Sequence, residues 1–158
     1  MTPYYSTELG KLYHGDCLEI MPELEPVDMI LCDLPYGITA CKWDTVIPFE
    51  PLWVQYKRLI KDNGAIVLTA SQPFTSVLGS LLLEWFRYEW VWDCVCTSGF
   101  LNANKRPLKQ HESVLVFSQA KLGNHTYNSQ FTDGESRVLT TGSPGANKGA
   151  YGMAGKVS

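Results

Sequence analysis

Several features that would point to common protein classes are missing from this sequence of 158 residues. No apolar run reaches the ~20 residues that a membrane-spanning helix needs, and no basic stretch followed by an apolar one opens the chain as in a signal peptide. The 5 cysteines form no CxxC pair, and the 3 histidines are scattered, so no zinc-type spacing exists. We therefore expect a cytoplasmic protein with reduced cysteines and no metal.

Charge is also sparse. Charged residues make up 18% of the chain and the net charge is −3, which is not the footprint of a protein that coats nucleic acid. Hydrophobic residues make up 45%, enough for one globular domain with a core. Three basic residues, Lys105, Arg106 and Lys109, nevertheless lie within five positions, beside His111. For an isolated cluster of this kind, a solvated loop is the ordinary interpretation.

Hydrophobic spacing predicts alternating strands and helices. Strands are expected at 12–14, 29–32, 65–69, 88–96 and 113–117, and helices at 18–24, 49–60 and 73–86. Such alternation is typical of an α/β protein with a three-layer, mainly parallel, doubly wound sheet, in which strand 65–69 lies beside strand 29–32.

Local signals refine these elements. Asn63-Gly64 is expected to end the second helix and Ser71 to cap the third. The tryptophans and tyrosines of these elements, among them Tyr88, Trp90 and Trp92, are expected in the core.

The most informative segment is Val27–Tyr36, where a mostly apolar run ends in Asp33, Leu34, Pro35 and Tyr36. This pattern puts a carboxylate and an aromatic ring at the carboxyl end of a buried strand, where open α/β sheets bind ligands. A strand followed by a Pro-Tyr turn, with Asp33 capping that turn, explains the same residues without any chemistry.

Asp33-Leu34-Pro35-Tyr36 resembles the Asp-Pro-Pro-Tyr motif of the amino-group DNA methyltransferases at three of four positions. The resemblance implies that Asp33 and the carbonyl of Leu34 accept hydrogen bonds from the two N–H groups of the target amino group, which frees its lone pair. Pro35 biases Leu34 towards an extended conformation that would aim this carbonyl outward. Tyr36 would stack on an extruded base, so that Tyr36→Phe is expected to keep most activity.

Other blocks extend the resemblance over about residues 11–119. The segment Gly15-Asp16-Cys17-Leu18 is similar to one that lies near the cofactor, which implies that Asp16 and Cys17, with Asp33, contact S-adenosylmethionine. Asp16 also suits the cap of the helix at 18–24, and both roles are compatible. In this family the loop before Lys105, Arg106 and Lys109 lies beside the active site, which implies phosphate contacts.

The order of the blocks matches phage and bacterial methylases whose catalytic half comes first. Their glycine-rich cofactor loop would follow later in the chain, and the glycines at 142–155 lie in a polar stretch that no apolar strand precedes. We therefore expect a catalytic half at 1–119, and a flexible segment or the start of a target-recognition region at 120–158. A class I methyltransferase fold that is incomplete should bind S-adenosylmethionine weakly by itself.

The resemblance implies methyl transfer from S-adenosylmethionine to double-stranded DNA, in a modification system. An Asp at the first motif position favours adenine N6 within this family. Cytosine N4, RNA and protein glutamine remain open as targets, because the same motif serves identical chemistry. A non-catalytic fragment that binds nucleic acid remains the third interpretation.

Overall fold

The computed structural model describes residues 1–130, of which Met1–Tyr127 form one compact unit. A small antiparallel hairpin, β1 (Tyr5–Ser6) and β2 (Lys11–Leu12), precedes the short helix α1 (Cys17–Ile20) and a 3₁₀ turn, η1 (Met21–Glu23). The glycine-rich stretch at 142–155 lies outside the described residues. The predicted boundary at residue 119 therefore stays a prediction.

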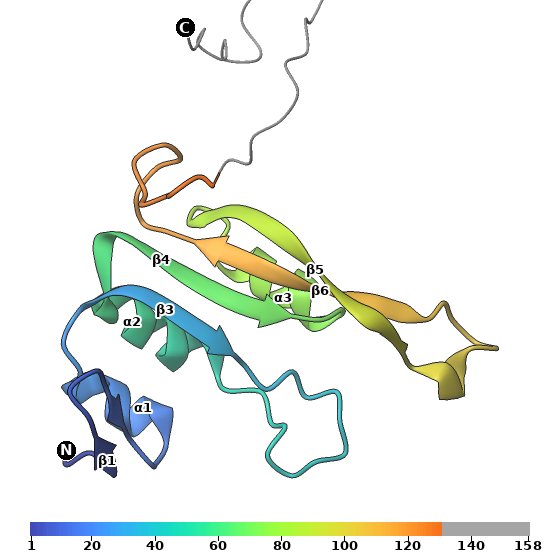
Figure 1. The fold of residues 1–158 in the computed structure, drawn as a ribbon, viewed down its shortest axis with the longest axis horizontal. Helices are drawn as coiled ribbons and strands as arrows, with labels where there is room; N and C mark the ends of the chain where they lie inside the picture. Colours follow the sequence, from blue (N-terminus) through green and yellow to red (C-terminus); the bar gives the residue numbers. More distant parts are fainter. Residues whose placement is uncertain (131–158) are drawn as a thin grey trace, which may run out of the picture. The chain divides into compact units, whose positions relative to one another are not determined.

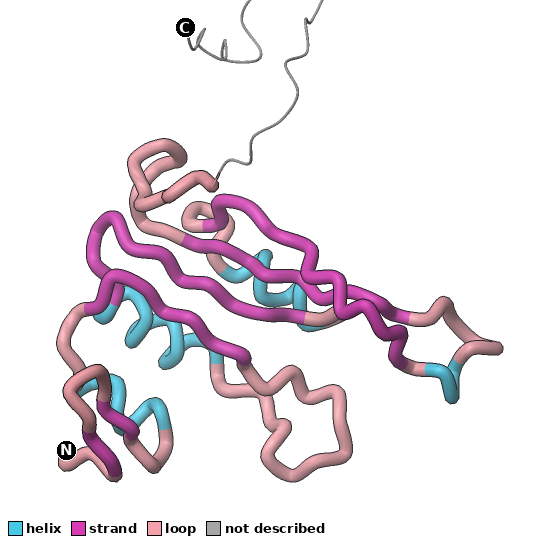
Figure 2. Tube along the Cα trace, in the orientation of Figure 1, coloured by secondary structure: helices cyan, strands magenta, loops and turns pink. Residues whose placement is uncertain are grey.

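The rest of the unit is a four-stranded sheet with two helices (Figures 1 and 2). In chain order the elements are β3 (Val27–Asp33), α2 (Phe49–Leu59), β4 (Ile60–Ala70), α3 (Phe74–Leu81), β5 (Phe86–Ser98), the 3₁₀ turn η2 (Phe100–Asn102) and β6 (Lys109–Phe117). The strands lie in the order β3-β4-β6-β5. No helix of the described residues is long and apolar enough to cross a membrane.

The predicted α/β class and the neighbouring pair β3 and β4 are confirmed. These strands are parallel, with Met29 opposite Ala65 and Asp33 opposite Thr69, and α2 provides the crossover between them. The expectation of a mainly parallel sheet is wrong for the described residues, because β6 is antiparallel to both β4 and β5. The connection from β5 to β6 contains only one 3₁₀ turn, and antiparallel neighbours need no longer crossover.

Two local signals were misassigned from the sequence. Gly64 does not end α2 but lies within β4, where a Cβ atom would come 2.7 Å from the carbonyl oxygen of Asp28. A close approach of two backbones, rather than a helix terminus, therefore requires this glycine. Ser71 makes no side-chain cap for α3; its hydroxyl instead accepts a hydrogen bond from Lys109 Nζ at 2.6 Å.

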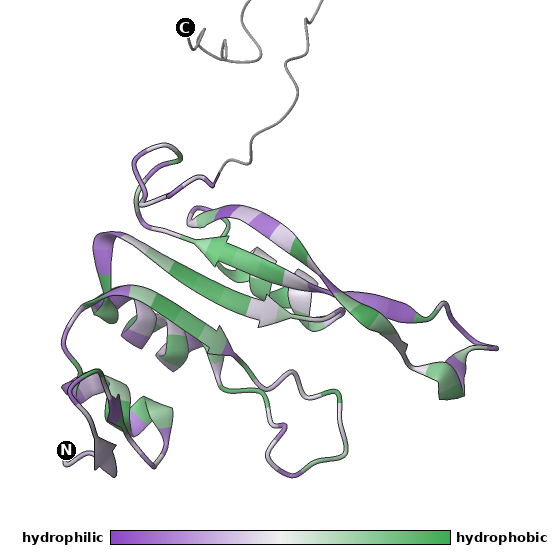
Figure 3. Cartoon of the chain, viewed as in Figure 1, coloured by the Kyte–Doolittle hydropathy of each residue, from purple (hydrophilic) through white to green (hydrophobic). Residues whose placement is uncertain are grey.

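The core lies between one face of the sheet and both helices (Figure 1). Ile66 and Leu68 of β4 point into it, and Leu52 of α2 and Leu78 of α3 pack among them. Phe117 of β6 completes the cluster, and all five are at most 1% exposed. Figure 3 shows the hydrophobic stretches of β3, β4 and β6 that this arrangement requires.

The opposite face of the sheet is called here the open face. Strand alternation and register give its members: Met29, Leu31, Asp33, Ala65, Val67, Thr69, Tyr88, Trp90, Trp92, Glu112, Val114 and Val116. The helices of the described residues cover only the other face, so these residues form two layers instead of the expected three. The prediction that Trp90 and Trp92 are core residues is accordingly wrong, because they are 50% and 56% exposed.

Candidate active site

The motif segment begins at the last residue of β3 and turns immediately into the core. Asp33 ends the strand with an exposed side chain, whereas Leu34 is only 5% exposed and belongs to the hydrophobic core. Leu34, which departs from the family motif, therefore anchors the turn through its side chain. The segment thus presents a carboxylate at the carboxyl end of a parallel strand, as the sequence predicts.

Two hydroxyl groups hold one oxygen of the Asp33 carboxylate. The Tyr36 hydroxyl lies 2.8 Å from Asp33 Oδ1 and 2.9 Å from Thr69 Oγ1. The Thr69 hydroxyl also donates to Asp33 Oδ1. Among the described residues Asp33 Oδ2 has no hydrogen-bond partner, so this oxygen is available to accept from a ligand.

The Tyr36 side chain is half-buried, and its ring packs against Phe74 with centroids 5.1 Å apart. Burial is the main cause that raises the pKa of Tyr36 above its ordinary value, and the adjacent Asp33 raises it further. The hydroxyl therefore keeps its proton at neutral pH and remains a hydrogen-bond donor. The family resemblance assigns a role to the ring alone and does not identify Thr69, which lies 36 residues from Asp33 and reaches it through the pairing of β3 with β4.

The loop after Tyr36 is organised by Asp44. Its carboxylate accepts hydrogen bonds from the backbone N–H groups of Gly37, Ile38 and Thr39 at 2.8, 2.9 and 2.7 Å. The pKa of Asp44 is lowered to about 2, mainly by a hydrogen bond from the Thr39 side chain and next by the one from the Gly37 backbone. Gly37 has a φ of +69°, and a Cβ there would come 2.9 Å from Val46 Cγ2, so glycine is required at this turn.

The two residues that the resemblance places near the cofactor lie at the start of α1. Asp16 caps this helix by accepting a hydrogen bond from the Leu18 N–H at 2.8 Å. Cys17 lines an apolar cavity of about 260 Å³ together with Cys32 and Leu34 of the motif strand and turn. Burial raises the pKa of the Cys17 thiol, so it is a neutral wall of this cavity.

These residues fit only part of S-adenosylmethionine. The Asp16 carboxylate is exposed and can accept hydrogen bonds beyond its cap, but the cavity beside Cys17 is lined by apolar, tyrosine and cysteine side chains and offers no charged partner for an amino-acid group. Within the described residues no strand is followed by a glycine-rich loop. The described residues therefore offer only part of such a site. The described residues also contain no cluster of His, Cys, Asp or Glu that could hold a metal ion.

Two of the three predicted basic residues line a second cavity, of about 570 Å³. Arg106 and Lys109 border it, with Ser71 and Gln72 after β4 and Ile38 of the motif loop. Lys109 Nζ donates to Ser71 Oγ and lies 3.1 Å from Glu112 Oε1. The structure thus brings Arg106 and Lys109 to the loop beside the motif, whereas Lys105 is exposed and does not line this cavity.

No protein-family model matches the sequence. The chain is 27% identical over 131 residues to the type II methyltransferase M.BamHI of Bacillus amyloliquefaciens, a match that covers 82% of this chain and 22% of that protein. The chain therefore spans about a fifth of the length of this relative.

Two solved structures share the fold. The M1.HpyAVI–SAM complex superposes with a TM-score of 0.56 at 23% identity, covering 86% of this chain and 67% of that one. The PvuII DNA methyltransferase, which is cytosine-N4-specific, gives a TM-score of 0.53 at 18% identity, covering 85% of this chain and 61% of the other. These likenesses establish the α/β fold of the chain.

Proposed function

We propose that this chain, as a relative of the DNA amino-methyltransferases, supplies the catalytic residues for methyl transfer from S-adenosylmethionine to an amino group of a DNA base. One observation carries the proposal: the Asp33 carboxylate is fixed at the end of β3 through Oδ1 while Oδ2 has no partner among the described residues. A preorganised acceptor of this kind is what an amino group needs in order to react as a nucleophile.

The residues act on the amino group in a defined way. Asp33 Oδ2 accepts a hydrogen bond from one N–H group of the amino group, and the carbonyl of Leu34 accepts one from the other. Together they localise the lone pair on nitrogen. When bound, the cofactor supplies an activated methyl group whose bonding electrons return to sulfur as the nitrogen lone pair forms the new bond. The methylated nitrogen then sheds one proton, for which Asp33 is the adjacent base.

Tyr36 and Thr69 position this acceptor. Their hydroxyl groups hold Asp33 Oδ1, which leaves the second oxygen facing the reacting nitrogen. The Tyr36 ring, supported from one side by Phe74, offers an aromatic surface for a base taken out of the duplex. Asp16 and Cys17 would contribute to the cofactor side of the site.

We further propose adenine N6 in double-stranded DNA as the target, with Lys105, Arg106 and Lys109 on the DNA backbone. Support for adenine comes from Asp33 at the first motif position. Cytosine N4 is the second candidate, because the PvuII DNA methyltransferase, named as cytosine-N4-specific, shares the fold.

A cellular experiment separates these targets. Because the described residues offer only part of a cofactor site, the chain is expressed together with the part of M1.HpyAVI that has no counterpart in it, in bacteria that lack DNA methylation. Their genomic DNA is digested to nucleosides for mass spectrometry. N6-methyladenine that disappears with Asp33→Ala is the expected result, and N4-methylcytosine would move the assignment to the second candidate. If neither methylated base is found, the proposal is refuted.

A further inference from the structure

The outer parts of β5 and β6 form a two-stranded ribbon that extends beyond the rest of the sheet. Strand β4 ends opposite Ser113 of β6, whereas the pairing of β5 with β6 continues outward to Ser98 and Lys109. We call residues 93–111 the arm, and Figure 1 shows it projecting past the end of β4. The arm therefore lies beyond the carboxyl ends of β3 and β4, at the edge of the sheet where Asp33 is placed.

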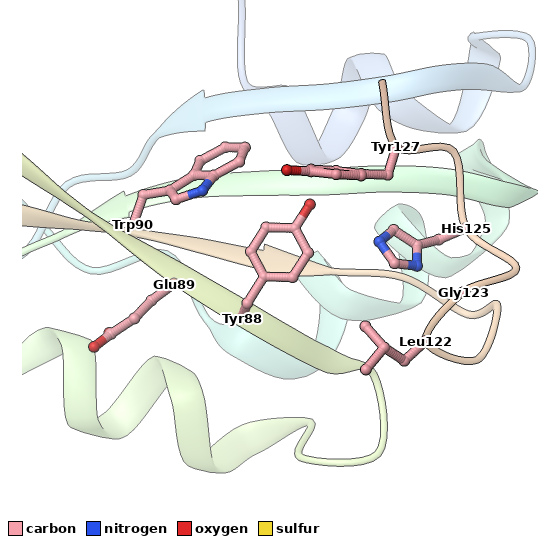
Figure 4. A pocket seen from close by; sticks show the side chains of 7 residues that line it. All are labelled: Tyr88, Glu89, Trp90, Leu122, Gly123, His125 and Tyr127. Carbon is pink, nitrogen blue, oxygen red and sulfur yellow. The ribbon is translucent and has the colours of Figure 1, made fainter. Parts of the chain in front are cut away.

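Two large apolar side chains stand at the outer end of the arm. Phe100 is 75% exposed and Leu101 is 82% exposed. The start of β5 differs, because Tyr88 and Trp90 have ring centroids 5.3 Å apart and border a cavity together with Tyr127 of the loop after β6 (Figure 4). Within the part of the chain that the structure describes, the fold thus provides partners for the aromatic residues at the start of β5 but leaves Phe100 and Leu101 largely in solvent.

The exposed pair is carried by an ordered turn, η2. The Asn102 N–H donates to the Gly99 carbonyl at 2.9 Å. The next N–H, that of Ala103, donates to the Phe100 carbonyl at 3.0 Å. Gly99, which precedes the turn, has a φ of +84°, a conformation that favours glycine. Because the backbone is already fixed, a partner that takes up Phe100 and Leu101 has little further loop ordering to overcome.

The charge around this pair is of one sign. Residues 94–111 contain three basic residues and no acidic one, although the net charge of the whole chain is −3. A Cβ atom at Gly99 would lie 3.8 Å from Arg106 Nη2, so the guanidinium group lies beside the turn that carries Phe100. Apolar side chains flanked by cations match a partner with an anionic surface and an apolar interior. A DNA duplex, with phosphates outside and stacked bases inside, is such a partner.

We propose that Phe100 and Leu101 form a wedge that enters the base stack of duplex DNA beside the target nucleotide and fills the space that the extruded base leaves. Lys105 and Arg106 then contact the flanking phosphates. This inference rests on the proposed function, because the wedge serves a base that leaves the stack to reach Asp33. Phe100 and Leu101 are positioning residues, since they act on the neighbouring bases and not on the reacting amino group.

The reach of the arm fits this role. Asp33 lies opposite Thr69 of β4, and Thr69 lies opposite Val114 of β6. Five residues of β6 separate Val114 from Lys109, which is about 17 Å of strand at ~3.4 Å per residue. The outer end of the arm lies beyond Lys109, so the wedge can remain in the duplex while the extruded base occupies the site at Asp33.

The surroundings of the arm favour DNA over an anionic membrane, which also combines a charged surface with an apolar interior. Arg106 and Ser98 of the arm border the cavity of about 570 Å³ that Ile38 of the motif loop also borders. The root of the arm therefore adjoins the loop that follows the catalytic motif. A substrate held at that motif comes within reach of the arm, and binding to a membrane would make no use of this proximity.

The test compares binding of the full chain to two DNA duplexes of the same sequence, one fully paired and one that lacks a single base at its centre. The abasic duplex already contains a vacancy, so the wedge enters it without the cost of unstacking a base. Fluorescence anisotropy should show about tenfold tighter binding, or more, to the abasic duplex. A fluorescent base analogue beside the vacancy should change its emission as Phe100 stacks on it.

Variants of the exposed turn identify the wedge. Phe100→Ser combined with Leu101→Ser should abolish the preference for the abasic duplex but leave the salt slope on the paired duplex unchanged, because no cation is removed. Phe100→Trp keeps an aromatic side chain and should retain the preference. Leu9→Ser is the matched control, because Leu9 is 99% exposed in the turn between β1 and β2. Circular dichroism of each variant checks that it is folded.

Failure to bind either duplex overturns the proposal, and so does a preference that the double variant retains. Vesicles of phosphatidylserine and phosphatidylcholine provide the membrane arm of the test. Vesicle binding that the double variant loses, without a preference for the abasic duplex, would assign the turn to a membrane and overturn the wedge.

The wedge and the proposed function fail separately. A preference for the abasic duplex that depends on Phe100 and Leu101, together with no methylated base in the cellular experiment, leaves the wedge standing and refutes the proposed function. Methylated DNA together with equal binding to the two duplexes refutes only the wedge.

Discussion

The two oxygens of the Asp33 carboxylate have different environments, and this difference predicts how substitutions at Asp33 behave. Oδ1 is held by Tyr36 and Thr69, and Oδ2 has no partner among the described residues. In enzyme that methylates DNA, Asp33→Ala should lower single-turnover methyl transfer by about a hundredfold or more, because one preorganised acceptor is lost. Affinity for S-adenosylmethionine should change much less. A near-normal rate of transfer by Asp33→Ala would show that Asp33 is not the acceptor for the target amino group.

The Tyr36 hydroxyl changes the expectation drawn from the sequence for Tyr36→Phe. Because the hydroxyl lies 2.8 Å from Asp33 Oδ1, its removal leaves Thr69 alone to hold that oxygen, and the carboxylate is less firmly oriented. We expect Tyr36→Phe and Thr69→Val each to reduce the rate of transfer while leaving DNA affinity intact. Tyr36→Ala should also weaken capture of the base, by about 1–3 kcal/mol of stacking.

Single-turnover rates and binding of duplexes that carry a fluorescent base analogue measure the two effects separately. Thr69→Ser retains the hydroxyl and serves as the control. A Tyr36→Phe enzyme with full rate would show that the hydroxyl network has no part in positioning Asp33.

At the scale of elements, the loop between β3 and α2 depends on the charge of Asp44. Its pKa of about 2 in the folded protein lies below the ordinary 3.8. Asp44 therefore stabilises the fold above pH 4, and this contribution is lost as the pH falls from about 4 through 2. Asp44→Asn lacks this titration, so the difference in Tm between the two proteins should shrink over that range. A constant difference from pH 7 to pH 2 would contradict the role of the carboxylate.

Lys105 and Arg106 lie in the connection between β5 and β6, and Lys109 is the first residue of β6. The proposed role of these basic residues can be tested by the salt dependence of DNA binding. Arg106→Ala and Lys109→Ala should each weaken binding to duplex DNA uniformly across sequences and lower the salt slope by about 1. Lys105→Ala should do the same if it too contacts phosphate. Lys11→Ala, on the exposed hairpin strand β2, is the control. Fluorescence anisotropy at several salt concentrations gives the slopes, and unchanged slopes would leave the cluster as a solvated loop.

The sequence predicts the helices and strands better than it predicts what each of them packs against. The periodicity of 49–60 and the apolar run at 65–69 located α2 and β4, because a residue's own neighbours decide such patterns. Alternation in β5 correctly put Trp90 and Trp92 on one face but could not tell whether anything covers that face. The contact of Thr69 with Asp33 depends on the register of two strands, and no local pattern encodes it.

For the whole molecule, the described residues contain the motif at 33–36 but offer only part of a site that would fit S-adenosylmethionine. Calorimetry of this chain with S-adenosylmethionine at neutral pH should therefore show little or no heat at micromolar protein. We expect weak binding because the described residues contain no glycine-rich loop that would let the backbone approach the amino-acid end of the cofactor. A dissociation constant in the micromolar range or below would mean that the chain contains a complete site.

The placement of the tryptophans also gives the protein an optical property. Trp53 is buried between α2 and the sheet, while Trp90 and Trp92 project from the open face into solvent. Indole emission shifts to shorter wavelength when water around the ring is replaced by apolar groups. The intrinsic fluorescence of this chain is therefore a label-free signal for anything that settles on β5, and Trp90→Phe with Trp92→Phe would leave a background dominated by the remaining indoles.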